Sequence, residues 1–155
     1  MDKEIFQFIY NERILRVLFE QRIFKLREIQ KEAIQKGLFF SKSFLECAPS
    51  GSGKTLIGEV CAIHIIFQQF GKSVYLVPFK ALVMEKYYHF KRAYEQFGIH
   101  VELSIGDYDV DDSKLEQADI IIKYIKYINC IKEKFFLSTV DFSLNPQDIS
   151  IIHNE

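Results

Sequence analysis

Apolar residues recur along the chain with two different spacings, and the spacing changes from one segment to the next. Between residues 5 and 24 they recur every three or four positions, for example at Ile14, Leu15, Leu18 and Phe19. This spacing places apolar side chains on one face of a helix. It therefore predicts one or two amphipathic helices at the start of the chain.

Over the rest of the chain, short apolar runs alternate with helical patterns. Strands are expected at residues 43–47, 73–77, 100–105, 118–122 and 149–153, and helices at residues 27–36, 56–70, 80–97, 113–117 and 125–135. Gly37 and Gly98 follow two of these helices, where glycine commonly ends a helix. Strands that alternate with helices usually form a parallel sheet with right-handed crossovers. We therefore expect an α/β fold whose sheet is covered by helices on both faces.

Length and composition fit one globular domain. The chain has 155 residues, and its 20 Lys and Arg nearly balance its 21 Asp and Glu, so binding to a polyanion would need a local basic patch. No apolar run approaches the roughly 20 residues that span a membrane, and the acidic N-terminus is unlike a signal peptide. Cys47, Cys61 and Cys130 lack metal-ligand spacing, which favours reduced thiols in a cytoplasmic protein.

The segment Ala48-Pro49-Ser50-Gly51-Ser52-Gly53-Lys54-Thr55 has the pattern of a phosphate-binding loop between a strand and a helix. Glycines at positions 51 and 53 allow backbone N–H groups to curl around a phosphate, and the helix start directs further N–H groups at it. Lys54 is expected to bridge the β- and γ-phosphates, and Thr55 to offer its hydroxyl to Mg²⁺. The residues expected to bind the nucleotide are Ser50, Gly51, Ser52, Gly53, Lys54 and Thr55. The segment predicts a nucleoside triphosphate site, although its first position is alanine instead of the usual glycine.

Three further segments narrow the class of this site: Phe24–Ile34, Tyr75–Leu82 and Ser104–Tyr108. Together with the phosphate-binding loop they resemble the first RecA-like domain of superfamily 2 helicases of the DExH/DEAD type, and the branch of archaeal repair helicases and Ski-type helicases is the most similar. The first segment, Phe24–Ile34, resembles the Q motif, which implies that Gln30 hydrogen-bonds the adenine edge of ATP. Taken alone, Gln30 could equally be an exposed residue on an amphipathic helix. The resemblance implies a RecA-like P-loop NTPase domain, with a parallel sheet flanked by helices, over residues 24–155. Residues 1–23 would form a preceding helical segment.

The other two segments imply a surface for single-stranded nucleic acid. Tyr75–Leu82 is similar to motif Ia, and Ser104–Tyr108 resembles motif Ib. The residues expected to contact the strand are Pro78, Lys80, Ala81, Gly106 and Asp107. Without the resemblance, the first segment is an ordinary strand end with proline at a helix start, and the second is a Gly-Asp turn.

The resemblance weakens after residue 122. The family's Thr/Ser-rich contact segment is replaced by residues in which Lys123 and Lys126 could meet phosphate, and Tyr124 and Tyr127 could stack on a base.

At the end of the chain, Asn154 is found in the place of the Walker B Asp that holds Mg²⁺, and Glu155 in the place of the general base. A neutral amide lacks the charge of that Asp. Lys54 and Glu155 are the expected catalytic residues. The resemblance also implies a domain that is incomplete at its C-terminus, without the strand that related folds insert between the Walker B strand and the phosphate-loop strand. A second polypeptide could supply the missing half.

The expected function is that of a helicase-type ATP-binding domain that binds ATP–Mg²⁺ and single-stranded DNA or RNA but is inactive as a motor alone. A non-catalytic nucleotide-binding or regulatory module is one alternative, which Asn154 favours. A small-molecule kinase is another, but kinases need arginines over the transferred phosphoryl group. Of the five arginines only Arg92 follows the phosphate loop, which argues against a kinase.

Overall fold

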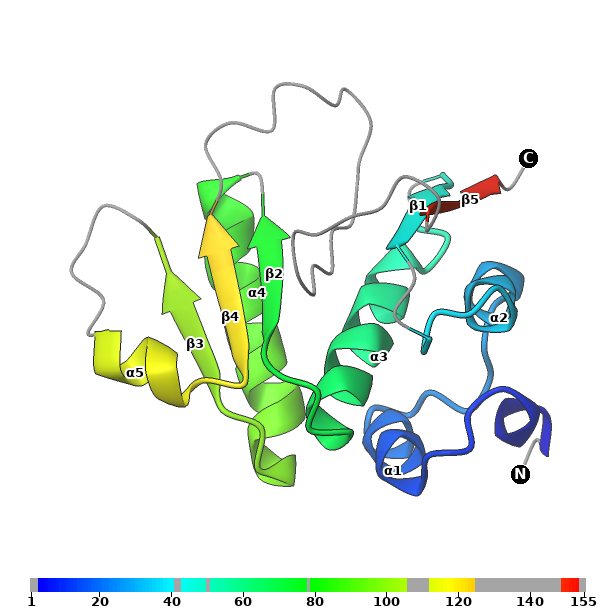
Figure 1. The fold of residues 1–155 in the computed structure, drawn as a ribbon, viewed down its shortest axis with the longest axis horizontal. Coiled ribbons are helices and arrows are strands. Elements are labelled where there is room, and N and C mark those ends of the chain that lie inside the picture. The colour runs from blue at the N-terminus through cyan, green and yellow to red at the C-terminus, as the bar shows by residue number, and fades with distance from the viewer. Residues whose placement is uncertain are drawn as a thin grey trace.

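The computed structural model describes residues 3–40, 43–49, 51–77, 79–105, 112–124 and 149–153. In chain order its elements are η1 (Lys3–Gln7), α1 (Glu12–Glu20), α2 (Glu28–Gln35), β1 (Ser43–Cys47), α3 (Lys54–Phe67), β2 (Ser73–Val77), α4 (Lys80–Tyr94), η2 (Glu95–Phe97), β3 (Val101–Ser104), α5 (Asp112–Gln117), β4 (Ile120–Tyr124) and β5 (Ile149–His153). Figure 1 shows their arrangement.

The helices and strands expected from the hydrophobic pattern are confirmed where the chain is described, and the expected helix at 125–135 lies outside the described residues. Some bounds differ from those expected: β3 is Val101–Ser104 and not 100–105, and α3 is Lys54–Phe67 and not 56–70. The strand β4 starts at Ile120, not at residue 118, and continues to Tyr124. The backbone N–H groups of Asp119 and Ile120 both donate to His100 O, at 2.9 and 3.0 Å, so the chain joins the sheet only at this point. Lys123 and Tyr124 therefore lie at the carboxyl end of a strand.

The strands form two parallel sets. β4 lies between β2 and β3 in a three-stranded sheet, and β1 pairs with β5 over five residues on each strand. The family resemblance implied a gap between the phosphate-loop strand and the last strand, left by the missing strand, but β1 and β5 pair directly with each other. Among the described strands, backbone hydrogen bonding is instead interrupted between the β1–β5 pair and the β2–β4–β3 sheet.

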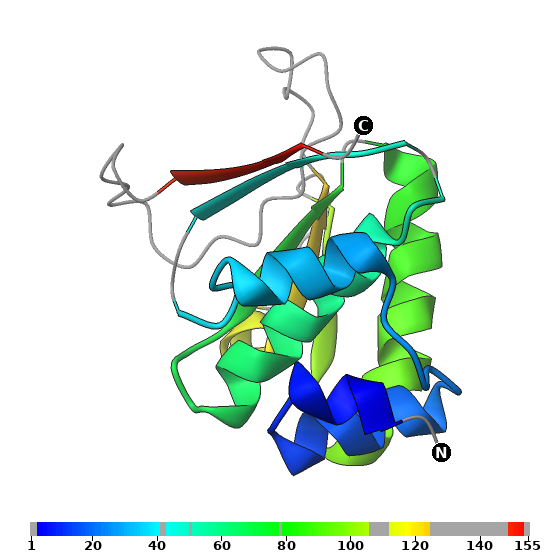
Figure 2. The same cartoon turned by 90° about the vertical axis from the view of Figure 1, so that its right-hand side faces the viewer.

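Most buried apolar residues form one core cluster, and a second, smaller cluster lies between α2 and α3. α4 lies behind the β2–β4–β3 sheet in Figure 1, and the rings of Phe90 on α4 and Tyr75 on β2 have centroids 4.9 Å apart. α3 lies beside β2, and Figure 2 shows the N-terminal helices grouped against α3. Ile14 and Leu18 of α1 belong to the same buried cluster as Ile63 of α3. The N-terminal helices are thus part of the core that positions α3.

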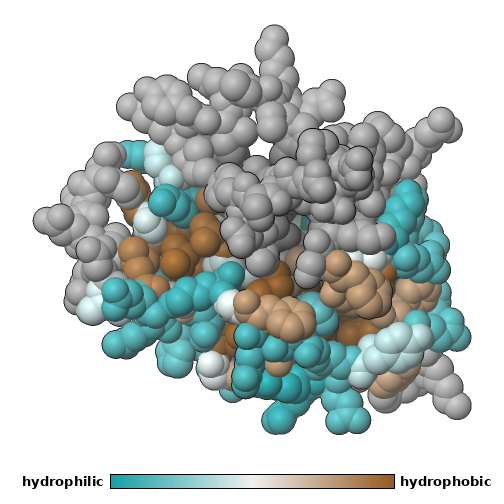
Figure 3. Space-filling model, in the orientation of Figure 1, coloured by the Kyte–Doolittle hydropathy of each residue, from teal (hydrophilic) through white to brown (hydrophobic). Residues whose placement is uncertain are grey.

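The other side of the three-stranded sheet is less covered by the described residues. Val74, Leu76 and Ile121 are only partly buried, whereas their strand neighbours that face α4 are buried. Figure 3 views this side and shows apolar residues among polar ones. None of the described helices is both long and apolar enough to cross a membrane.

Candidate nucleotide-binding site

The loop between β1 and α3 closes around the ammonium group of Lys54. Lys54 Nζ donates to Ala48 O and, at 2.7 Å, to Pro49 O, and it lies 3.4 Å from Ser52 Oγ. Only 8% of Lys54 is exposed. The backbone N–H of Ser52 points to the same side and donates to Pro49 O at 3.3 Å. The inner side of the loop therefore holds a buried cation and an inward N–H group, which are the donors that a phosphate needs.

Two glycines give the loop its curvature. Gly51 and Gly53 have φ angles of 83° and 102°, in the region that side chains disfavour. A Cβ atom at Gly53 would lie 2.5 Å from Gln30 Nε2, whereas one at Gly51 would meet nothing within 4 Å. Gly53 is thus required by its conformation and also by the close approach of Gln30.

Gln30 and Arg27 fasten the outer side of the loop to the start of α2. Gln30 Nε2 donates to Gly53 O at 3.0 Å, and Arg27 Nη1 donates to Gly51 O. Gln30 Oε1 accepts from the backbone N–H of Arg27 at 2.8 Å, which caps this N–H at the start of the helix as the N3 residue of a capping box does. Because Gln30 is 5% exposed and bonded at both ends of its amide, it is not the exposed helix residue of the simpler alternative.

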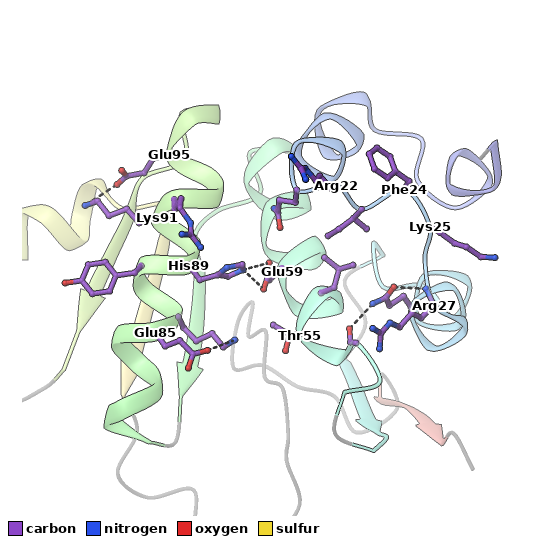
Figure 4. Close-up of a pocket in the computed structure, with 18 residues that line it drawn as sticks. Arg22, Phe24, Lys25, Arg27, Thr55, Glu59, Glu85, His89, Lys91 and Glu95 are labelled. Carbon is purple, nitrogen blue, oxygen red and sulfur yellow. Dashed lines mark hydrogen bonds and ion pairs between the residues drawn. The ribbon is translucent and has the colours of Figure 1, made fainter. Parts of the chain in front are cut away.

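A cleft of about 1320 Å³ extends from the phosphate loop between two walls (Figure 4). One wall is α4, the other is the segment from Gln21 to Gln30, and α3 lies between them with Thr55, Leu56 and Glu59. Phe24 lines the cleft with half of its surface exposed. Six cationic side chains line it as well: Arg22, Lys25, Arg27, Lys86, Lys91 and Arg92. The cleft therefore offers an aromatic face and a positive rim beside the loop.

A buried acid connects the two helices that border the cleft. Glu59 of α3 has its carboxylate 3.2 Å from His89 Nε2 of α4, and it accepts a hydrogen bond from Tyr94 Oη. Burial, together with the nearby Glu59 carboxylate, raises the pKa of Tyr94 well above its ordinary value. Burial raises the pKa of Tyr75 in the same way. Both phenols therefore stay protonated at physiological pH and can act as donors.

At the rim of the cleft, Lys91 of α4 is held by Tyr87 of the same helix and by Glu95 of η2. Lys91 Nζ donates to Tyr87 Oη at 3.0 Å and lies 3.3 Å from a carboxylate oxygen of Glu95. The hydrogen bond with Tyr87 raises the pKa of Lys91 most, and the pairing with Glu95 raises it further. Lys91 therefore keeps its positive charge at the rim.

The structure brings together most of the residues expected to bind the nucleotide. Gly51, Ser52, Gly53, Lys54 and Thr55 form the loop and the first turn of α3, and Gln30 contacts that loop. The residues that lie outside the described part of the chain are Ser50, Asn154 and Glu155. The described residues contain no group of three His, Cys, Asp or Glu side chains that could hold a metal ion. Thr55, on the first turn of α3 and lining the cleft, can offer a hydroxyl to Mg²⁺.

The expected nucleic-acid contacts are less completely described. Lys80 and Ala81 begin α4, and Lys80 Nζ lies 5.4 Å from the centre of the Tyr124 ring at the end of β4. Phe79, the residue before the helix, is 65% exposed. Pro78, Gly106 and Asp107 lie outside the described residues. The carboxyl edge of the sheet thus combines a lysine with two aromatic rings.

Three residues of the site were not singled out from the sequence. Glu59 gives the clearest signal, because it is the one acidic residue in the mainly apolar α3, and buried acids need partners. Phe24 and Arg27 lie in the segment that resembles the Q motif, but no local pattern shows that they face the cleft and the loop.

Comparison with known proteins gives matches over most of the chain. A family model described as DEAD/DEAH box helicase matches residues 27–144. The chain is 42% identical over 112 residues to the ATP-dependent DNA helicase Hel308 of Thermococcus kodakarensis, which covers 72% of this chain and 10% of the relative. It is 44% identical over 115 residues to the protein of the same name from Methanococcus vannielii, which covers 70% of this chain and 15% of the relative. The chain thus spans a small part of the length of these relatives.

Solved structures share the fold. The DUF1998 helicase MrfA is similar with a TM-score of 0.58 and 26% identity, over 74% of this chain and 19% of that one. The RNA-helicase Prp28 from Chaetomium thermophilum bound to ADP is similar with a TM-score of 0.58 and 20% identity, over 74% of this chain and 30% of that one. These likenesses confirm the predicted RecA-like arrangement of a parallel sheet flanked by helices.

Proposed function

The chain belongs to the DEAD/DEAH box helicase family, and from this we propose that it is a helicase ATP-binding domain that holds ATP–Mg²⁺ at the phosphate loop and a single nucleic-acid strand at the carboxyl edge of its sheet. The observation that carries the proposal is the buried Lys54, whose ammonium lies inside a loop shaped by Gly51 and Gly53. The names of the relatives, ATP-dependent DNA helicases, support both ligands.

Lys54 would bind the phosphates by exchanging partners. Its ammonium now donates to two neutral carbonyl oxygens, Ala48 O and Pro49 O. Phosphate oxygens carry negative charge, and charge-assisted hydrogen bonds are roughly twice as strong as neutral ones. The start of α3 adds its N–H groups to the same site. Thr55 would hold Mg²⁺, whose charge offsets that of the phosphates.

Gln30 can recognise adenine while it keeps its contact with the loop. Its amide nitrogen carries two hydrogens and its oxygen two lone pairs, and the structure uses one of each. The remaining donor and acceptor match the adenine edge, where guanine has O6, an acceptor, in place of the N6 amino donor. Phe24 offers an exposed ring on the same side of the cleft for stacking on the base. We therefore expect ATP to bind more tightly than GTP.

A single strand would cross the end of the sheet at Lys80, Phe79 and Tyr124. A lysine supplies charge for phosphate, and aromatic rings supply stacking surfaces that accept any base. The relatives' names favour DNA, and parallel binding measurements with DNA and RNA oligonucleotides of one sequence decide between the two.

A non-catalytic nucleotide-binding module remains a second candidate, because Asn154 takes the place expected for the Walker B Asp. A neutral side chain there would hold Mg²⁺ weakly, so we expect the chain alone to bind ATP with little hydrolysis. Nothing in the family match supports a kinase. Steady-state ATPase assays with and without single-stranded DNA test this second candidate, since a robust, DNA-stimulated rate excludes it.

The adenine preference is tested by equilibrium titration with MgATP and MgGTP. The wild-type chain is expected to prefer MgATP, and Gln30→Ala to lose most of that preference. Lys36→Ala is a suitable control, because Lys36 pairs with Glu32 at 2.8 Å on the surface of the same helix. Equal affinity of the wild type for both nucleotides contradicts the proposed role of Gln30.

A further inference from the structure

The contact of Arg27 with the phosphate loop fixes the direction of one peptide group. In a trans peptide, the C=O of one residue and the N–H of the next point in opposite directions. Arg27 Nη1 binds Gly51 O on the outer side of the loop, so the N–H of Ser52 must point inward. That N–H donates to Pro49 O, which is also a partner of the Lys54 ammonium.

Gln30 acts on the next glycine in the same way. Its Nε2 binds Gly53 O, and the N–H of Lys54 belongs to that peptide group. Each of the two phosphate-loop glycines, both of which have positive φ, therefore has its carbonyl bound by one side chain from the start of α2. The two side chains differ in burial, because Gln30 is buried whereas Arg27 is exposed.

We propose that Arg27 is a positioning residue of the phosphate loop, which keeps the Gly51 carbonyl outward and thereby aims the Ser52 N–H at the triphosphate without touching the nucleotide. This inference rests on the proposed function, since it assigns a role in the same site. It goes beyond that function because it gives the two residues different roles. Gln30 binds both the base and the loop, whereas Arg27 binds the loop alone.

The position of Arg27 suits this role. Its backbone is the N-cap of α2 and its N–H is bound by Gln30 Oε1, so the side chain starts from a fixed point. Its Cδ passes 3.1 Å from the position that a Cβ of Gly53 would take, so the chain runs along the loop before it reaches Gly51 O. The planar guanidinium of arginine, on its long side chain, can reach this carbonyl. The ammonium of lysine is a point charge on a flexible side chain, so it can replace this contact only in part.

The main alternative is direct contact with the nucleotide, because Arg27 also lines the cleft. The two roles predict different ligand dependence. A residue that shapes the loop affects every ligand with a triphosphate, whereas one that touches base or ribose affects only ligands that carry those groups.

The first test needs no nucleotide. Amide hydrogen exchange of Ser52, followed by NMR, is expected to be several-fold faster in Arg27→Ala than in the wild type, and Arg27→Lys is expected to restore part of the protection. Lys36→Ala, at a surface position outside the cleft, serves as the control. Unchanged exchange at Ser52 in Arg27→Ala overturns the inference, whatever the nucleotide affinity of the chain.

The second test compares the affinities of MgATP, MgGTP and magnesium tripolyphosphate by equilibrium titration. Arg27→Ala is expected to weaken all three by a similar factor of about ten, the equivalent of one charged hydrogen bond, and Arg27→Lys by about threefold or less. A loss confined to MgATP and MgGTP, with tripolyphosphate unchanged, assigns Arg27 to base or ribose and overturns the inference. If Lys54→Ala binds as the wild type does, the proposed function itself fails. If Arg27→Ala does not fold, the affinities of Arg27→Lys and Arg27→Gln for the same three ligands test the inference in its place.

Discussion

The carboxylate of Glu59 lies 3.2 Å from Nε2 of His89, which joins the helix that begins at the phosphate loop to the helix that begins at the expected nucleic-acid edge. Glu59 is almost fully buried, and Tyr94 donates a second hydrogen bond to it. A buried polar group costs free energy when it loses its partners. The pair therefore stabilises the contact between α3 and α4.

Replacing Glu59 with alanine is expected to lower the free energy of unfolding by about 2 to 3 kcal/mol, because it leaves the buried Tyr94 hydroxyl without its acceptor. Glu59→Gln keeps an acceptor and is expected to cost about 1 kcal/mol. Chemical denaturation measures both. Glu85→Ala, at an exposed acid on the same cleft, should change stability by less than about 0.5 kcal/mol. Equal losses for Glu59→Ala and Glu85→Ala contradict this account.

Gly53→Ala tests the close packing of Gln30 against the loop. The variant combines an unfavourable φ with a contact of 2.5 Å to Gln30 Nε2, so a loss of about 2 to 3 kcal/mol in stability is expected. Gly51→Ala has only the unfavourable φ and should cost about 1 to 2 kcal/mol. The double variant Gly53→Ala/Gln30→Ala removes the contact with Gln30 Nε2 and leaves only the 3.1 Å approach to Arg27 Cδ, so its loss should be smaller than the sum of the two single losses. Additive losses would show that the two residues do not touch.

His64 predicts a pH dependence of stability. Burial lowers the pKa of this side chain below its ordinary value of 6.5, and a hydrogen bond with the backbone of Phe39 offsets the shift only in part. Below pH 6.5 the unfolded chain therefore binds a proton that the folded chain resists. The stability that neutral His64 provides is present above this pH and is lost as the pH falls through 6.5 to the lower folded pKa. His64→Phe should keep the ring contact with Phe39, whose centroid lies 4.5 Å away, and remove this component. The test is urea unfolding from pH 8 to pH 5, in which parallel curves for the two proteins contradict the prediction.

Lys80 predicts the salt dependence of nucleic-acid binding. If its ammonium meets a phosphate, Lys80→Ala should weaken binding to single-stranded oligonucleotides of every sequence by a similar factor. The slope of log affinity against log salt concentration should become shallower by about 0.7 to 1. Fluorescence anisotropy at several salt concentrations measures this slope, with Lys36→Ala as the control. An unchanged slope removes Lys80 from the interface.

Local patterns predicted most of the fold, because helices and strands with one buried face carry their periodicity in the sequence. The order β2–β4–β3 and the direct pairing of β1 with β5 depend on contacts between distant segments, which no local pattern encodes. The same holds within the site. The glycines and Lys54 could be predicted because phosphate binding requires these residues at fixed spacing. The contact of Arg27 with Gly51 joins residues 24 positions apart, and only the packing of α2 against the loop reveals it.

Equilibrium titration of the chain with MgATP, in the wild type and in Lys54→Ala, tests the central claim most directly. The account predicts saturable binding by the wild type and a loss of about 100-fold or more in the variant, because an ammonium that contacts two phosphates is removed. Lys36→Ala should bind as the wild type does. Equal affinity of the wild type and Lys54→Ala would contradict the assignment of the loop as the ATP site.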